Sequence, residues 1–234
     1  MKTMKMTVAV MAAVMTMAVS VMAVEAEITL SVDAASAYVF RGVTFNDGPV
    51  LQPGMEAEIG SFVIGVWGNI DLDDFDGTLE EGQFSEIDVY AAYALPVEFM
   101  DIAIEYCEYT YPGAEGKADR EFALAFGLDV PLSPSLLVAY GVDGGIKKDL
   151  YVELGAGYEM DVAEMFSIEL GATIGYLSPD EGDSGFSNYT LTLGAAKGPL
   201  YASVTYVGQI DDDVLTDEDY DVEVYGLLGM AFSF

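Results

Sequence analysis

The sequence predicts an all-β fold: a transmembrane, antiparallel, up-and-down β-barrel of about twelve strands, of the outer-membrane type. Three observations predict it. Apolar residues alternate with polar or small residues along most of the chain, and long polar connections alternate with tight turns. No hydrophobic run of helix-spanning length follows residue 26. Because lipid offers no hydrogen-bond partners, the protein must satisfy every backbone polar group itself, and such a chain can therefore cross a membrane only as a closed barrel.

The composition is both strongly acidic and strongly apolar. The 234 residues carry a net charge of −32, yet 52% of them are hydrophobic and 12% are aromatic. A chain with both characters must separate them in space, and a membrane barrel does so with a lipid face and a water face. The charge excludes a nucleic-acid partner, because phosphates would be repelled.

The first 26 residues have the layout of a secretory signal peptide. Lys2 and Lys5 form a positive start, an uncharged and mostly apolar run covers residues 6–21, and small residues stand at Ala23 and Ala26. We expect cleavage after Ala23 or Ala26, which leaves a barrel domain of residues 27–234. A retained membrane anchor is the alternative, although the run is short for a span.

The strand period recurs along the rest of the chain. Between residues 166 and 176, for example, apolar residues occupy the even positions, and Ser, Glu, Gly and Thr occupy the odd ones. Twelve segments fit this pattern, and ten strands is the alternative if two weaker segments are loops. The expected strands are 27–40, 50–59, 62–72, 84–94, 100–110, 120–130, 135–143, 149–160, 165–176, 186–196, 200–210 and 220–234. An even number places both ends on the tight-turn, periplasmic side.

The last strand carries a further signal. Its apolar face ends in Phe232 and Phe234, a pattern that we associate with recognition by the barrel-assembly machinery. The alternative is an ordinary strand that happens to end in Phe. The other expected partners are outer-membrane lipid and lipopolysaccharide, which fits a location in the outer membrane of a Gram-negative cell.

Acidic residues fall on the face opposite the apolar one. By parity, we expect the following to face the lumen: Glu56, Glu58, Asp71, Glu86, Asp88, Asp101, Glu105, Glu121, Asp149, Glu153, Glu169, Asp221 and Glu223. Carboxylates crowded in a dry core would be costly, whereas a water-filled lumen tolerates them and attracts cations. The sequence therefore predicts a narrow, cation-preferring channel for ions or small solutes. The alternative is a plugged structural barrel, or a surface-binding barrel without transport.

Three stretches resemble the TorF family, a conserved outer-membrane family with an expected porin role. They are the residues SAYVFRGV at 36–43 with NDGP at 46–49, GVWGNID at 65–71, and EIDVY at 86–90 followed by YCEYTYPG at 106–113. The resemblance implies an outer-membrane barrel with a channel role, and it brings no catalytic residues. From motif position alone, we expect Tyr38, Arg41, Trp67, Tyr109 and Tyr111 to lie at a constriction or rim. The alternative is the interface girdle or interior packing.

Catalytic and cofactor chemistry is not expected. The chain has no histidine and a single cysteine, Cys107, which removes imidazole-dependent catalysis and an intrachain disulfide. We therefore expect no enzyme, no cofactor and no metal centre. Acid runs at 211–213 and 217–219 could attract divalent cations weakly, but solvated loops are the simpler interpretation.

Overall fold

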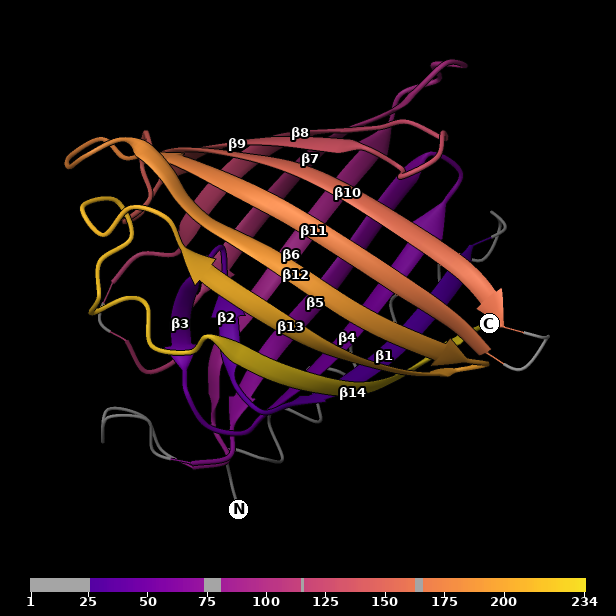
Figure 1. The fold of residues 1–234 in the computed structure, drawn as a ribbon, viewed down its shortest axis with the longest axis horizontal. Coiled ribbons are helices and arrows are strands. Elements are labelled where there is room, and N and C mark those ends of the chain that lie inside the picture. Colours follow the sequence, from indigo (N-terminus) through magenta and orange to yellow (C-terminus); the bar gives the residue numbers. More distant parts are fainter. Residues whose placement is uncertain (1–25, 74–80, 115, 163–165) are drawn as a thin grey trace.

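The computed structural model describes residues 26–73, 81–114, 116–162 and 166–234 (Figure 1). The expected signal peptide lies outside these residues, apart from Ala26. Within them, the expected fold class is confirmed: twelve strands form one closed antiparallel barrel, with two short strands in addition. The described part of the chain contains no helix that is long and apolar enough to cross a membrane.

The barrel strands agree closely with the expected segments. They are β1 (Glu27–Ala35), β4 (Val50–Ile59), β5 (Phe62–Asp71), β6 (Phe84–Ala94), β7 (Asp101–Thr110), β8 (Asp119–Gly127), β9 (Ser135–Asp143), β10 (Leu150–Val162), β11 (Phe166–Ser178), β12 (Gly185–Lys197), β13 (Leu200–Gln209) and β14 (Val224–Ser233). Each pairs with its neighbour in the chain, and β1 closes the ring by pairing with β14 on one side and β4 on the other.

The two faces of the wall follow the alternation in the sequence. On β8, Glu121 and Ala123 are buried, whereas Phe122 and Leu124 between them are about half exposed. Directly paired residues on neighbouring strands share a face, so the ladder carries this division around the ring. The apolar residues form the outer, lipid-type surface, and the carboxylates, threonines and glycines line the interior.

The strand order places the connections at two ends (Figure 1). The connections 144–149, 179–184 and 210–223 lie at one end, which we call the long-loop end because it holds the long connection 210–223. The two-residue turns 60–61 and 198–199 lie at the other, the tight-turn end, together with the connections 95–100 and 128–134. The C-terminus lies at the tight-turn end (Figure 1), where Thr29 of β1 pairs with Ser233.

The first expected strand is too long, and the reason is a hairpin that the sequence pattern conceals. β1 ends at Ala35, and the chain then forms a second hairpin from β2 (Tyr38–Phe40) and β3 (Val43–Asn46). Its two-residue turn, Arg41-Gly42, has positive φ at both positions, 53° and 89°. This is the geometry of the tightest hairpin turns, and glycine adopts it without strain.

The last expected strand begins too early. β14 starts at Val224, so Asp221 lies in the connection before it and not on the lumen wall, which corrects the expectation for that residue. Glu223 is exposed at the edge of the strand, where its carbonyl accepts a hydrogen bond from the Val207 amide at 2.7 Å. Residues 210–223 form turns that fold over the barrel mouth, so the alternation expected for a strand does not apply there.

Candidate functional site in the barrel lumen

The β2–β3 hairpin crosses the barrel interior. It leaves the wall between β1 and β4, and its tip contacts β8 through Glu121 and β10 through Tyr151. β9 lies between these two strands in the ring. Counted around the ring, it is six strands from β1 in one direction and five strands from β4 in the other. The hairpin therefore reaches from one side of the lumen to the opposite wall.

A socket on the far wall holds the hairpin tip. The Arg41 guanidinium donates to both carboxylate oxygens of Glu121, at 2.9 and 2.8 Å. It also lies over the rings of Phe40 and Tyr151, at 4.7 and 4.5 Å from the centroids. The Tyr109 hydroxyl donates to the same Glu121 carboxylate at 2.8 Å. A two-pronged ion pair with ring contacts on the cation is among the most specific ways to fix an arginine.

The Arg41 guanidinium at the hairpin tip stays positively charged. Burial alone would lower the pKa of Arg41, but the hydrogen bonds and the negative charge of Glu121 outweigh it, so the pKa is raised above its ordinary value. The side chains of Arg41 and Glu121 are 20% and 7% exposed. The tip is thus held by a largely desolvated ion pair.

The base of the hairpin is tied to β5 by aromatic rings and amides. The Tyr38 ring packs against Phe45 and Trp67, with centroids 5.2 and 5.5 Å apart. Asn46 is fully buried, and its Nδ2 donates to Asp71 Oδ1 at 2.5 Å. Burial, with the nearby charge of Glu86 and Asp88, raises the pKa of Tyr38 above its ordinary value. The Tyr38 hydroxyl therefore keeps its proton and can donate.

The connection between β13 and β14 covers the outer side of the hairpin. The Thr44 amide donates to the Asp219 carbonyl at 2.8 Å, and the Thr44 hydroxyl accepts from the Val222 amide at 3.1 Å. Leu215 is buried, and a Cβ placed on Gly42 would lie 2.9 Å from its Cδ2. The hairpin tip is thus enclosed between the far wall and this connection.

A cavity of about 190 Å³ lies beside the hairpin tip, toward the long-loop end. Rings of Phe40, Tyr109 and Tyr151 supply much of its lining, and the carboxylates of Glu86 and Glu121 reach its edge. Asp149, expected on the lumen wall, lines the cavity from just before β10. The cavity therefore combines aromatic surface with negative charge.

The expected lumen acids fall into two groups. Asp71, Glu86, Asp88 and Glu121 are buried around the hairpin, with 1%, 3%, 8% and 6% exposure. Six others are half-buried or exposed: Glu56, Glu58, Asp101, Glu105, Glu153 and Glu169. Two of these accept from wall tyrosines, Glu56 from Tyr90 at 3.0 Å and Glu153 from Tyr151 at 3.0 Å.

Positive charge inside the barrel is scarce. Among the basic residues that the structure describes, Arg41 alone projects into the lumen. Arg120 alternates with Glu121 and lies on the outer face, where it pairs with Glu108 and Asp143 at 2.7 and 3.0 Å. The exposed lysines lie in connections or at a strand end: Lys117, Lys147, Lys148 and Lys197. The interior field is therefore negative on balance.

The five residues expected at a constriction or rim lie together. Tyr38 and Arg41 are on the hairpin, Trp67 packs against Tyr38, and Tyr109 contacts Glu121. Tyr111 lies just beyond β7 and lines the cavity. Their proximity is observed, and their role in narrowing a pathway stays a prediction.

Sequence reasoning missed the hairpin, although a signal was present. Arg41-Gly42 stands between two short aromatic and β-branched runs, which is the pattern of a two-residue hairpin. It also missed Asn188 of β12, which is buried against the tip: a Cβ on Gly42 would lie 2.8 Å from the Asn188 Cβ.

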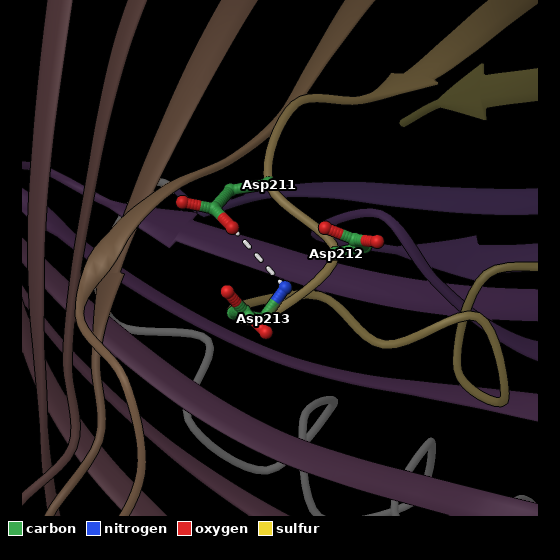
Figure 2. A group of neighbouring side chains, drawn as sticks. All are labelled: Asp211, Asp212 and Asp213. Atoms are coloured by element: carbon green, nitrogen blue, oxygen red, sulfur yellow. Dashed lines mark hydrogen bonds between the residues drawn. The ribbon is translucent and has the colours of Figure 1, made fainter.

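The acid run at 211–213 forms a compact turn (Figure 2). The three carboxylates lie within 4.8 Å of one another, and the Asp213 amide donates to Asp211 Oδ1 at 3.1 Å. Asp212 and Asp213 are exposed and Asp211 is half-buried. This is a solvated acidic loop, and on its own it does not define a metal site.

The comparisons with known proteins agree with this architecture. The structure of the NanC porin is 9% identical, with a TM-score of 0.55, and the match covers 87% of this chain and 98% of that one. An outer membrane channel from Pseudomonas putida F1 is 9% identical, with a TM-score of 0.50, over 90% of this chain and 96% of that one. At such identity the likeness shows the fold alone.

The comparison with curated proteins gave no match. A family model matches residues 19–226, which is most of the chain, and its description is "Bacterial protein of unknown function" (Gcw_chp). The chain, a twelve-stranded barrel with a hairpin across its lumen, belongs to the Gcw_chp family of bacterial proteins.

Proposed function

We propose that this protein is a narrow outer-membrane channel that prefers cations, with the β2–β3 hairpin as its constriction. The observation that carries the proposal is the charge of the interior. Carboxylates line the lumen on β4 to β8, and Arg41 is the single described basic side chain among them. A negatively lined, partly desolvated path raises the local concentration of cations and excludes anions.

The fold and the family resemblance support a transport role. The solved structures with the same fold include a porin and an outer membrane channel, and the resemblance to the TorF family adds the expectation of a channel. A twelve-stranded barrel is narrow beside general porins of 16–18 strands. With a hairpin inside, the transported species would be ions or small solutes.

The hairpin also favours a second candidate, a plugged structural barrel. The Arg41–Glu121 pair and the buried amides at the hairpin base would hold a permanent plug as well as a constriction. The two candidates differ in one property, which is whether ions pass through the folded protein.

Ion flux from liposomes separates the two candidates. The purified protein is inserted into vesicles loaded with KCl, and K⁺ and Cl⁻ release are followed with separate indicators. The channel predicts faster release of K⁺ than of Cl⁻. No release from barrels that are folded and inserted, as shown by their heat-modifiable mobility in gels, would favour the plugged barrel, and faster Cl⁻ release would refute the cation preference.

A further inference from the structure

Two buried carboxylates beside the hairpin lack a positive partner. Glu86 and Asp88 are two residues apart on β6, on the lumen side, and they are 3% and 8% exposed. Neither forms an ion pair with any basic residue that the structure describes; the nearby Glu121 takes Arg41. Buried carboxylates without compensation are costly, so this pair is stabilised either by a counter-charge or by a proton that the two groups share.

One oxygen of the pair is unsatisfied. Asp88 Oδ1 is buried and has no hydrogen-bond partner within the described residues. The Glu86 and Asp88 carboxyl groups interact with each other, and the Tyr38 hydroxyl lies against Glu86. Two carboxylates supply oxygen ligands of the kind that hard cations prefer, and the Tyr38 hydroxyl places a further oxygen beside them.

One member of the pair borders a cavity. Glu86 lines the 190 Å³ cavity at the long-loop end, together with Glu121, Asp149 and Arg41, so an ion in this cavity lies close to its carboxylate. Asp88 lies deeper along the same strand, and its register partner on β5 is Trp67. The order from the outside is therefore cavity, Glu86, then Asp88.

From this arrangement we infer that Glu86, Asp88 and the Tyr38 hydroxyl form a binding site for a divalent cation of the Ca²⁺ or Mg²⁺ class. A divalent ion neutralises both carboxylates at once and satisfies Asp88 Oδ1. The inference deepens the proposed function, and it rests on that function for the claim that the ion lies on a transport path. Within that function, the site is where permeating cations pause beneath the hairpin.

The protein carries its own reporter for this site. Trp67 is the single tryptophan of the chain; it packs on Tyr38 and pairs in register with Asp88. The full-length protein in detergent is titrated with CaCl₂ and, separately, MgCl₂ at constant ionic strength, with selective excitation of tryptophan. We expect a saturable change in Trp67 emission.

Two variants show whether the emission change depends on this site. Asp88→Asn keeps the shape of the side chain and removes its charge. We expect the cation to bind about tenfold more weakly or not at all, because the loss of one contact to a charged group weakens binding by roughly this factor. Asp212→Asn alters the exposed acid loop at 211–213 and should leave the titration unchanged. If Asp88→Asn does not fold, Tb³⁺ luminescence excited through Trp67 in the unaltered protein, and its displacement by Ca²⁺, replaces the variant.

Each outcome decides the inference. No emission change with either ion, an Asp88→Asn titration equal to that of the unaltered protein, or a response abolished by Asp212→Asn would overturn the site. A saturable response that depends on Asp88 supports it. The flux experiment is independent: binding without flux would refute the channel and keep the site, and flux without binding would do the reverse.

Discussion

The Arg41 guanidinium, at the tip of a hairpin rooted between β1 and β4, is bound by both oxygens of Glu121 on β8, at 2.9 and 2.8 Å. This contact joins opposite sides of the barrel through its interior. It also places the lumen's one described basic side chain against one of its most buried acids. We expect the hairpin position, and with it the width of any pathway, to depend on this pair.

Arg41→Ala should release the hairpin tip. Removing one partner of a buried ion pair costs about 3–5 kcal/mol, mostly because the other charge is left uncompensated. We expect a larger single-channel conductance and more frequent current fluctuations in planar bilayers. The matched control is Lys148→Ala, which breaks an ion pair of 2.8 Å with Asp180 whose side chains are 57% and 44% exposed. Such pairs contribute little, so unchanged conductance is expected there; equal conductance in Arg41→Ala and the unaltered protein would contradict the constriction.

Gly42→Ala should displace the same hairpin tip through a steric clash. Gly42 has φ of +89°, and an added Cβ would lie 2.8 Å from Asn188 Cβ and 2.9 Å from Leu215 Cδ2. Gly198→Ala carries a similar backbone penalty at φ +58° but meets nothing within 4 Å. We expect Gly42→Ala, and not Gly198→Ala, to speed protease cleavage within the hairpin. Equal cleavage rates would show that the close packing at Gly42 does not hold the hairpin.

Gly65→Ala tests the packing of the lumen wall itself. An added Cβ would lie 2.2 Å from Cζ of Tyr90, the ring that pairs with Gly65 and whose hydroxyl donates to Glu56. Overpacking of this kind costs about 1–3 kcal/mol, so the temperature at which the barrel loses its compact form in gels should fall. Gly157→Ala is the control, because its nearest contact would be an ordinary 3.7 Å. A Gly65→Ala barrel as heat-resistant as Gly157→Ala would contradict this close packing.

The sequence predicted the barrel well because its physical cause is local. Each strand has one apolar outer face and one lumen face, so its period of two is visible in the residues themselves. Ten of the twelve segments needed at most small changes at their ends. The two larger errors occurred at segments that are not strands of the barrel wall. Tyr38 and Phe40 alternate like wall residues, although both lie inside the barrel, and Asp221 belongs to a loop that packs on the hairpin.

The side-chain contacts inside the lumen could be found only from the three-dimensional structure. Parity placed Glu86, Asp88 and Glu121 on the inner face, but no pattern indicates that Arg41, some 80 residues earlier, pairs with Glu121. That pairing depends on how a hairpin from one side of the ring meets the opposite wall. Side-chain identity predicts the face, whereas contacts across a barrel depend on its closure and on what folds into it.

The measurement that tests the account most directly is the reversal potential of the purified protein in a planar bilayer under a KCl gradient. The account predicts discrete current steps with a reversal potential of cation sign. It also predicts a shift toward zero in the double variant Glu105→Gln, Glu153→Gln, which removes two half-buried lumen charges. A reversal potential of anion sign, or no current from correctly folded and inserted barrels, would contradict it.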